Sequence, residues 1–349
     1  MFNYLLKRVG LGLATIFVVT ALVSFIIYWA PVDPARISFG QRTDENTVAM
    51  LKAKYYLDKS PGIQILRYFE DIFPLQFISK LDARLSDYNY VSLIDFSGSN
   101  LIVKTPYLRR SYHSGALVSS ILYEAIWPTL ILAILATIFS FILGTILGWL
   151  ATRNPGGVGD RVIVSTTSIF YAIPSYIMAI VLSMIFAYGS NLFPIQGSLW
   201  DLSDSGELTF KISNLWLPLI SLTIRPISQI CQMVRVSILE IKNSEFIRTA
   251  KAKGLIDNQV FFYHVLKNAI NPVISTVGSW FASLLAGAYF VEYIFNYKGM
   301  GLVTIQAVSQ FDIPVVVGCC VMAVIIFTTV SLISDLLYAV FDPRVRLDA

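Results

Sequence analysis

Few side chains in this sequence are suited to covalent chemistry or metal binding. It contains two histidines, His113 and His264, and three cysteines, Cys231, Cys319 and Cys320, all three in apolar stretches. Their spacing matches neither a zinc site nor a disulfide framework, and no Ser, Cys or carboxylate constellation accompanies His264 as catalysis would require. Phosphate-binding loops, dinucleotide fingerprints, zincin histidine pairs and nucleophile elbows are absent too. We therefore predict that the chain is not an enzyme and binds no cofactor or metal itself.

The most polar stretch between two long apolar ones runs from Ser244 to Pro272 and reads SEFIRTAKAKGLIDNQVFFYHVLKNAINP. Gly254 divides it into two short helices, with Ser244 as the N-cap of the first and Gly254 at its C′ position. Asp257 is suited to cap the second helix, which runs to about Asn268. A short helical elbow beside a membrane is suited to bind in a partner's groove, but a solvated connecting loop shows the same pattern. The pattern does not choose between these interpretations.

The composition is typical of a membrane protein. Of the 349 residues, 56% are hydrophobic and only 14% are charged, which is far from the balance of a soluble domain. The formal net charge of +4 is small, and positive charge beside a membrane is explained by topology. We therefore expect contact with membrane lipid and no nucleic-acid partner.

Six stretches meet or approach the roughly 20 apolar residues that a bilayer helix needs. They are Val9–Ala30, Ala125–Ala151, Val162–Ala187, Leu215–Val234, Pro272–Val291 and Ile313–Tyr338. The first is longer than the apolar core of a signal peptide and lacks a small-residue cleavage site, so we interpret it as a retained helix. The fourth is the weakest, because Arg225 and Pro226 interrupt it. The sequence predicts an all-α membrane protein with six transmembrane helices.

Positive charges in the short loops predict the orientation. With the N-terminus in the cytoplasm, the inner side holds Lys7, Arg8, Arg153, Arg161, Arg235, Lys242, Arg248, Lys251, Lys253, Lys267, Arg344 and Arg346. The short outer loops hold only Lys211 and Lys298, so both termini are expected inside. The chain then divides into residues 1–30 (N-terminus and first helix), 31–124 (extracytoplasmic segment), 125–341 (five-helix core, including a cytoplasmic segment at 236–271) and 342–349 (cytoplasmic tail).

The long extracytoplasmic segment contains several candidate elements. Thr43–Tyr56 has the apolar spacing of a helix. Asp71–Arg110 is rich in aromatic residues and in short alternating stretches such as Tyr88–Phe96, which are suited to strands. The segment is too short to hold a large core of its own, so we expect it to pack on the membrane helices.

The polar stretch carries a family resemblance. RTAKAKG at residues 248–254, followed by HVLKNA at residues 264–269, resembles the cytoplasmic signature loop of ABC importer permeases, in the variant of the B-type subunit of the oligopeptide, dipeptide and nickel importer family. Ala250 and Gly254 fall on the small positions of the general Glu-Ala-Ala…Gly pattern, and an arginine and a threonine replace its first two letters. Small residues permit close backbone approach, and charged flanks fix register and orientation.

Further fragments resemble the same family in the correct order, so the resemblance covers most of the chain. They lie at residues 30–35, 56–61, 127–130, 172–176, 297–301, 311–316, 335–338 and 342–346. The first departs from the family's Ala-Pro-Gly-Asp-Pro, because Val32 replaces the glycine. The stretch Asp71–Arg110 is longer than in typical members. It is either an elaboration that contacts the solute-binding protein or a packing appendage.

In that family the signature loop forms a coupling helix that docks on an ATP-binding subunit. The residues that the resemblance assigns to ATPase coupling are Glu245, Arg248, Thr249, Ala250, Lys253, Gly254, His264 and Leu266. It implies a multi-pass permease of the type I ABC importer kind in the inner membrane, working with a second related permease, two ATP-binding subunits and an extracytoplasmic solute-binding protein. ATP and Mg would be held by the partner subunits. Peptides are the expected solutes, with nickel chelates and oligosaccharides as alternatives.

Arg225 and Pro226 are a second candidate site, because a charge within a membrane helix usually faces the protein interior or a water-filled cavity. Arg225 is suited to line the translocation path and meet a solute carboxylate. Alternatively, it pairs with an acid or reaches the outer interface.

A channel or secondary transporter without an ATPase partner is the alternative function. The hydropathy shows no inverted repeat, and the spans hold no paired acids of the kind that ion coupling uses. A membrane-bound enzyme, a third alternative, would need a cluster of acid-base or nucleophilic groups on one membrane face, and the sequence shows none.

Overall fold

The structure is a computed structural model that describes residues 2–29, 58–80, 82–96, 98–202 and 207–341. The predicted helix Thr43–Tyr56 and the motifs at residues 30–35 and 342–346 lie outside the described residues. The chain forms two compact units. The helical unit comprises Met1–Val9, Ile126–Leu302 and Ile326–Ala349, and the mixed unit comprises Gly10–Ala125 and Val303–Ile325.

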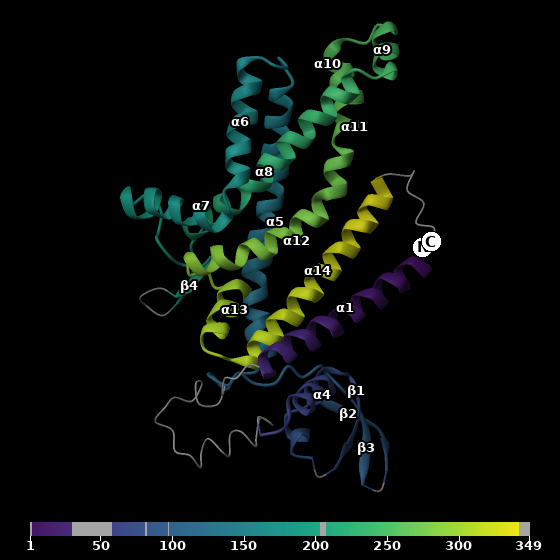
Figure 1. Ribbon diagram of the computed structural model, residues 1–349, viewed down its shortest axis with the longest axis vertical. Coiled ribbons are helices and arrows are strands. Elements are labelled where there is room, and N and C mark those ends of the chain that lie inside the picture. Colours follow the sequence, from purple (N-terminus) through teal and green to yellow (C-terminus); the bar gives the residue numbers. More distant parts are fainter. Residues whose placement is uncertain (1, 30–57, 81, 97, 203–206, 342–349) are drawn as a thin grey trace. The chain divides into compact units, whose positions relative to one another are not determined.

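The helical unit is built from long helices joined by short connections (Figure 1). Its main elements are α5 (Val118–Ala151, from residue 126 on), α6 (Val158–Ala172), α7 (Ser175–Leu182), the π-helical turn η2 (Ser183–Gly189), the strands β4 (Trp200–Leu202) and β5 (Leu208–Phe210), α8 (Ser213–Lys242) and α12 (Asn271–Ile294). Between α8 and α12 lie α9 (Glu245–Ala252), α10 (Asp257–Gln259), the π-helical turn η3 (Val260–Leu266) and α11 (Lys267–Ala269). Helix α8 is central, because it packs against α6, α7 and α12.

Two hydrophobic clusters hold the helical unit together. One joins Leu132 of α5, Leu222 of α8 and Val291 of α12. The other surrounds the last turns of α8, and close helix approach supports it: a Cβ on Gly148 of α5 would lie only 2.7 Å from the carbonyl oxygen of Cys231 on α8. A side chain at this glycine would therefore push the two helices apart.

The predicted third span is bent rather than straight. The apolar run Val162–Ala187 predicts one helix, but the structure has α6 and then α7 with η2, at 101° to each other. Ile173, which ends α6, has extended backbone angles (φ −83°, ψ 123°). The following Pro174 is the cause, because a residue before proline is disfavoured in the helical region.

The fourth predicted span, whose apolar run Arg225 and Pro226 interrupt, lies in one continuous helix. Helix α8 runs unbroken through Pro218 and Pro226 over 30 residues. Both prolines are buried among the helices that pack on α8, and such neighbours can compensate for the backbone groups that a proline leaves unpaired. Packing therefore overrides the local signal.

Within the described residues, three helices are long and apolar enough to cross a membrane, or four if α6 with α7 and η2 counts as one broken span. The three segments are Val9–Ile26 in α1 (Phe2–Trp29), Val118–Ala151, which is α5, and Ile313–Ser334 in α14 (Ile313–Phe341). Helices α8 and α12 cover the two remaining predicted spans with 30 and 24 residues. The total of six spans stays a prediction.

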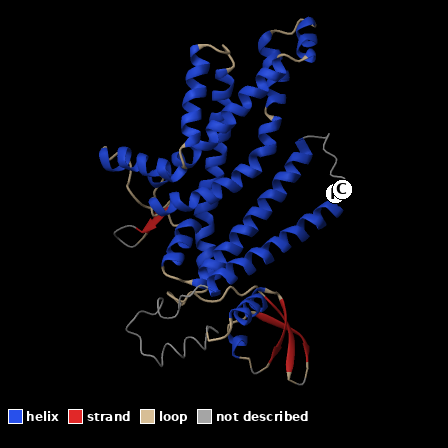
Figure 2. Cartoon of the chain, in the orientation of Figure 1, coloured by secondary structure: helices blue, strands red, loops and turns tan. Residues whose placement is uncertain are grey.

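The mixed unit combines helices with a small sheet. It contains most of α1, α4 (Pro61–Ile72), β1 (Leu75–Ser79), the 3₁₀ turn η1 (Ala83–Ser86), β2 (Tyr90–Asp95), β3 (Ser99–Lys104), the start of α5, and parts of α13 (Met300–Ser309) and α14. The strands pair antiparallel in the order β1-β3-β2 (Figure 2). The strands expected within Asp71–Arg110 are thus confirmed, and β2 lies inside the predicted stretch Tyr88–Phe96.

Apolar clusters stabilise the mixed unit, and one of them joins the start of α5 to α13 and α14. Ile78, Tyr88 and Ile102 form a small core under the sheet. Tyr68 of α4 packs with Val317 of α14 in a separate cluster that also includes residues of α1. The expectation that the segment before α5 packs on membrane helices is confirmed by this last cluster.

Several charged side chains of the mixed unit are buried and paired around Asp71. The carboxylate of Asp71 accepts hydrogen bonds from Arg109 Nε at 2.8 Å and from the Tyr88 hydroxyl at 2.5 Å, and Arg84 lies 3.4 Å away. Asp71 is 2% exposed and Arg109 6%. Burial of the phenol beside this carboxylate raises the pKa of Tyr88 well above its usual range. We call these four residues the charge cluster.

Lys104 extends the charge cluster. Its ammonium donates hydrogen bonds to Gln76 Oε1 at 2.7 Å and to the Glu70 carbonyl at 2.8 Å, and lies 3.7 Å from the centre of the Tyr88 ring. Burial opposes the charged form and lowers the pKa of Lys104 to about 8, although the nearby carboxylate of Asp71 acts in the opposite direction. Desolvation therefore outweighs the favourable contacts.

Candidate functional site

The elbow, which we define as residues 244–272, connects the end of α8 to the start of α12. The predicted break at Gly254 is confirmed: Gly254 follows α9 with φ +82°, a left-handed conformation suited to glycine at a C′ position. Ser244 precedes α9 as predicted, but its hydroxyl donates to the Ile241 carbonyl at 2.6 Å instead of accepting from the helix.

Asp257 does not cap the second helix as expected. It is the first residue of α10, and its carboxylate lies 2.7 Å from Lys251 Nζ of α9. The ion pair lowers the pKa of Asp257, with the hydrogen bond from Lys251 as the main cause. The side chain therefore joins the two short helices across Gly254. The second helical segment continues through η3 and α11 to Ala269, close to the predicted end.

Helix α9 has one buried face and one exposed face. Ile247 (2% exposed) and Ala250 (8%) pack in the cluster that contains Val234 and Ile238 of α8. The exposed side chains are Glu245, Phe246, Arg248, Thr249, Lys251 and Lys253. Four of the eight predicted coupling residues therefore have exposed side chains here, whereas Ala250 is buried in a cluster with residues of η3 and α8.

The second half of the elbow carries aromatic residues that sequence reasoning missed. His264 and Leu266 are half-buried, while Phe262 and Tyr263 are 52% and 72% exposed. Phe261 stacks on Trp149 of α5 with 5.8 Å between ring centroids. The signal was present, because three aromatic residues in succession, Phe261 to Tyr263, are unusual in a polar stretch.

An ion pair near the elbow was also missed. Arg235 of α8 donates to both carboxylate oxygens of Asp160 of α6, at 2.6 and 2.7 Å, and Asp160 also accepts from the Gly156 amide at 2.8 Å. Lys242 Nζ donates to the Thr152 carbonyl at 3.1 Å. These contacts fix the turn between α5 and α6 to α8, and this turn and the elbow lie at the same end of the helical unit (Figure 1).

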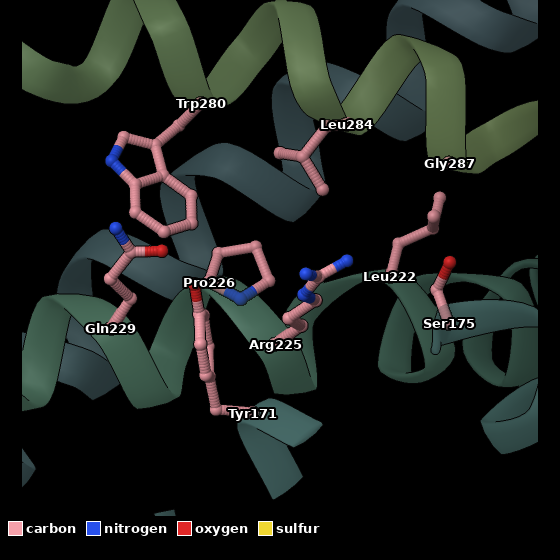
Figure 3. A pocket seen from close by; sticks show the side chains of 9 residues that line it. All are labelled: Tyr171, Ser175, Leu222, Arg225, Pro226, Gln229, Trp280, Leu284 and Gly287. Carbon is pink, nitrogen blue, oxygen red and sulfur yellow. The ribbon is translucent and has the colours of Figure 1, made fainter. Parts of the chain in front are cut away.

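A pocket lies between α8 and α12, with the end of α6 and the start of α7 beside it (Figure 3). It encloses about 140 Å³, several times the space that a single water needs. The described side chains and glycine that line it are Tyr171, Ser175, Leu222, Arg225, Pro226, Gln229, Trp280, Leu284 and Gly287. Both residues predicted at the translocation path, Arg225 and Pro226, thus lie in this pocket. The other lining residues were not singled out from the sequence.

The guanidinium of Arg225 lies in the space between α8 and α12 (Figure 3), 5.3 Å from the centre of the Tyr171 ring. Arg225 is exposed to this space. Within the described part of the chain, no carboxylate forms an ion pair with it, so none of the described acids there supplies the partner that one interpretation expected. The ring contact is of the cation–π kind and orients the guanidinium.

The fold has known relatives. A chain of the MetNI methionine ABC transporter, in an inward-facing structure, matches with a TM-score of 0.52 and 18% identity, covering 64% of this chain and 97% of that chain. A chain of an amino acid ABC transporter solved with histidines matches with a TM-score of 0.51 and 14% identity, covering 63% and 94%. These likenesses identify the fold as that of type I ABC importer permeases.

The family follows from the sequence. Residues 144–347 match the model of the binding-protein-dependent transport system inner membrane component, and residues 1–84 match that of its N-terminal region. The chain belongs to this family. It is therefore an inner-membrane permease subunit of an ABC importer and not an enzyme, and an importer of this class works with ATP-binding subunits and a solute-binding protein. The resemblance found in the signature loop is confirmed.

Curated relatives match over nearly their full length. A probable peptide ABC transporter permease protein of Sinorhizobium fredii is 26% identical over 98% of this chain and 99% of its own. The dipeptide transport system permease proteins of Escherichia coli and Bacillus subtilis are each 29% identical, over 99% of both chains.

Proposed function

We propose that this chain is one of two related permease subunits that together enclose the translocation path of an ATP-driven peptide importer. Six helices cross the inner membrane with both termini in the cytoplasm, and lipid surrounds them. Residues 31–124 then lie on the outer side, where the solute-binding protein delivers its solute, and the elbow lies on the cytoplasmic side. ATP and Mg are bound by two partner ATPase subunits and not by this chain. The names of the relatives support peptides over nickel chelates or oligosaccharides.

The observation that carries the proposal is the position of the elbow between the two helices that line the pocket. Four lining residues lie on α8 and three on α12: Leu222, Arg225, Pro226 and Gln229, then Trp280, Leu284 and Gly287. The elbow is the covalent link between these helices. A partner that pulls on the elbow therefore acts on both walls of the pocket at once, as a rigid-body switch between two states requires.

The two faces of α9 have different roles in coupling: the buried face packs within this chain, and the exposed face contacts the ATPase. Ile247 and Ala250 hold the helix against η3, in a cluster that also includes residues of α8, so that movement of α9 is transmitted. Arg248, Thr249 and Lys253 on the exposed face contact the ATPase, with Glu245 beside them. Gly254 permits the bend, and His264 and Leu266 position the second half of the elbow.

The test is a tagged pull-down from gently solubilised membranes, with bound proteins identified by mass spectrometry. We expect a second permease and ATP-binding subunits with the parent chain. A variant with Arg248→Glu and Lys253→Glu should lose the ATPases and keep the permease, because both side chains are exposed and reversed charges disfavour the interface. Lys211→Glu, which changes an exposed lysine between β5 and α8, is the matched control and should keep both.

Ala250→Glu tests the buried face and should weaken ATPase binding by displacing α9. If the folded parent chain brings down no ATPase, the proposal is contradicted and a channel or secondary transporter becomes the better account. If the charge-reversed variant retains the ATPases as well as the parent, the exposed face of α9 is not the docking surface.

A further inference from the structure

The pocket between α8 and α12 places a cation beside groups that suit a small carboxylate. The guanidinium of Arg225 presents several N–H donors in a plane, which matches the two oxygens of a carboxylate. It lies 5.3 Å from the centre of the Tyr171 ring, and a cation–π contact of this kind takes up none of the hydrogen-bond acceptors that a solute would supply. The structure thus holds a positioned cation facing a cavity.

Gln229 adds a neutral polar group to the same wall. It stands four residues after Arg225 on α8, so the two side chains share one face of the helix. In Figure 3 the amide of Gln229 faces the indole of Trp280 on α12. An amide accepts and donates hydrogen bonds without carrying charge. It can therefore bind a peptide group beside the carboxylate without competing for the guanidinium.

The opposite wall is apolar and restricts size. Trp280 and Leu284 project from α12 toward α8 (Figure 3). At one end, a Cβ on Gly287 would lie 3.3 Å from Ser175 Oγ and 3.8 Å from Leu222 Cδ2, so a larger residue there would narrow the cavity. A volume of about 140 Å³ has room for the end of a small solute.

We infer that this pocket is a subsite for the carboxylate end of the transported solute, in which Arg225 binds the carboxylate, Gln229 binds the adjoining peptide group, and Trp280 with Leu284 covers the last side chain. The inference rests on the proposed function, because it assumes that a peptide passes between α8 and α12. It adds the chemical class that the path itself recognises: a short peptide with a free C-terminal carboxylate. Such a subsite lets the permease discriminate after the binding protein has released its solute.

The experiment uses the assembled transporter in liposomes with its binding protein and two probes, trialanine and trialanine amide. For each variant, ATP-driven uptake of the free acid is divided by uptake of the amide. Any preference of the binding protein cancels when this ratio is compared with that of the parent complex. ATP hydrolysis stimulated by loaded binding protein is measured alongside, to show that each variant complex has assembled with its ATPases.

We expect Arg225→Gln to lower the acid-to-amide ratio by at least about tenfold, since a charged hydrogen bond pair contributes that much or more. Gln229→Glu leaves Arg225 in place but supplies an internal carboxylate four residues away, and should lower the ratio in the same direction. Lys211→Gln, which removes an exposed cation outside the pocket, should leave the ratio unchanged.

If Arg225→Gln leaves the acid-to-amide ratio unchanged, whether or not uptake of both probes falls equally, the inference is overturned. A parent complex that assembles with its ATPases and hydrolyses ATP but imports neither probe contradicts the proposed function instead. In that case equilibrium binding of the two probes to the solubilised complex decides the inference. A preference for the free acid that Arg225→Gln abolishes supports the subsite, and the lack of one refutes it.

Discussion

Two polar regions of this chain use the same residue types in different ways. In the charge cluster of the mixed unit, Asp71 and Arg109 are 2% and 6% exposed and lie 2.8 Å apart. In the elbow, Arg248 and Lys253 are exposed, and within the described residues no ion pair involves either of them. Burial gives the first set a structural role, because an unpaired buried charge is costly. Exposure leaves the second set available to a partner. The difference shows that burial, not composition, separates a charge that is paired within the chain from one that is available to a partner.

The largest expected effect breaks the charge cluster. Asp71→Ala removes the buried acid that pairs with Arg109 at 2.8 Å, which should lower the free energy of unfolding by about 3–5 kcal/mol. Arg84 keeps its ion pairs with Asp82 and Glu70, so the loss is expected to come from Arg109. Urea unfolding of the purified complex, followed by protease sensitivity of residues 58–110, measures the loss. Asp95→Ala is the control, since its carboxylate is 66% exposed where it pairs with Lys80, and the expected change is below about 1 kcal/mol. Equal effects would remove the distinction between buried and exposed pairs.

The next effect concerns pH. Lys104 has a pKa of about 8 in the folded chain against 10.5 for an ordinary lysine, chiefly through burial. Between these values the unfolded chain binds the additional proton, so the free energy of unfolding should rise with pH, by up to about 1.4 kcal/mol per pH unit. The comparison runs from about pH 8 to about pH 9.5, below the range in which tyrosines ionise. Lys104→Met should remove the rise. Parallel pH profiles for parent and variant would show that Lys104 is not the titrating group.

A smaller effect is expected at the bend of the elbow. Gly254 has φ +82°, and a Cβ there would meet no atom within 4 Å. Gly254→Ala should therefore destabilise the end of α9 by about 1 kcal/mol through backbone strain rather than through a clash. Gly254→Asn should recover part of this loss, because asparagine tolerates the left-handed region. Amide hydrogen exchange of α9 in the intact complex measures both, and identical protection in all three proteins would contradict the strain argument.

The smallest effect on stability sharpens the comparison most. Arg248→Gln should change the free energy of unfolding by less than about 0.5 kcal/mol, as expected for a surface substitution. The same variant should show weaker stimulation of ATP hydrolysis by loaded binding protein, because position 248 lies on the exposed face of α9 that we propose contacts the ATPase. If stability falls as far as it does in Asp71→Ala, the elbow charges are structural after all.

The elbow could be predicted from sequence because its signals are local. A glycine after a basic turn predicted the end of α9, and the left-handed Gly254 bears this out. The predictions of the helix caps were less accurate. Asp257 pairs with Lys251 instead of capping α10, since a carboxylate at that position can either cap the helix or form an ion pair. Ala250 was assigned by its small size, but its burial among residues of η3 and α8 depends on tertiary packing that the pattern does not specify.

Features that depend on distant residues were not predictable. Asp71 and Arg109 stand 38 positions apart, and Asp160 and Arg235 stand 75 apart, so no window of sequence contains either pair. Among the helices, the span that contains Pro174 is broken and bent there, whereas α8 continues through Pro226 as one helix. Local rules treat the two prolines alike, and the packing around each one decides the outcome.

The π-helical turn η3, Val260–Leu266, has a consequence for how this chain tolerates changes of length. A π-helical turn holds one residue more than an α-helical turn. Deleting one residue there, for example the exposed Tyr263, should convert η3 to ordinary α-helix and leave the helical phase of α12 intact. One residue lost between η3 and Trp280 would instead rotate the pocket face of α12 by about 100°. The π-helical turn thus places one additional residue between α9 and the pocket wall. A single-residue deletion within η3 is therefore expected to leave the register of α12 unchanged.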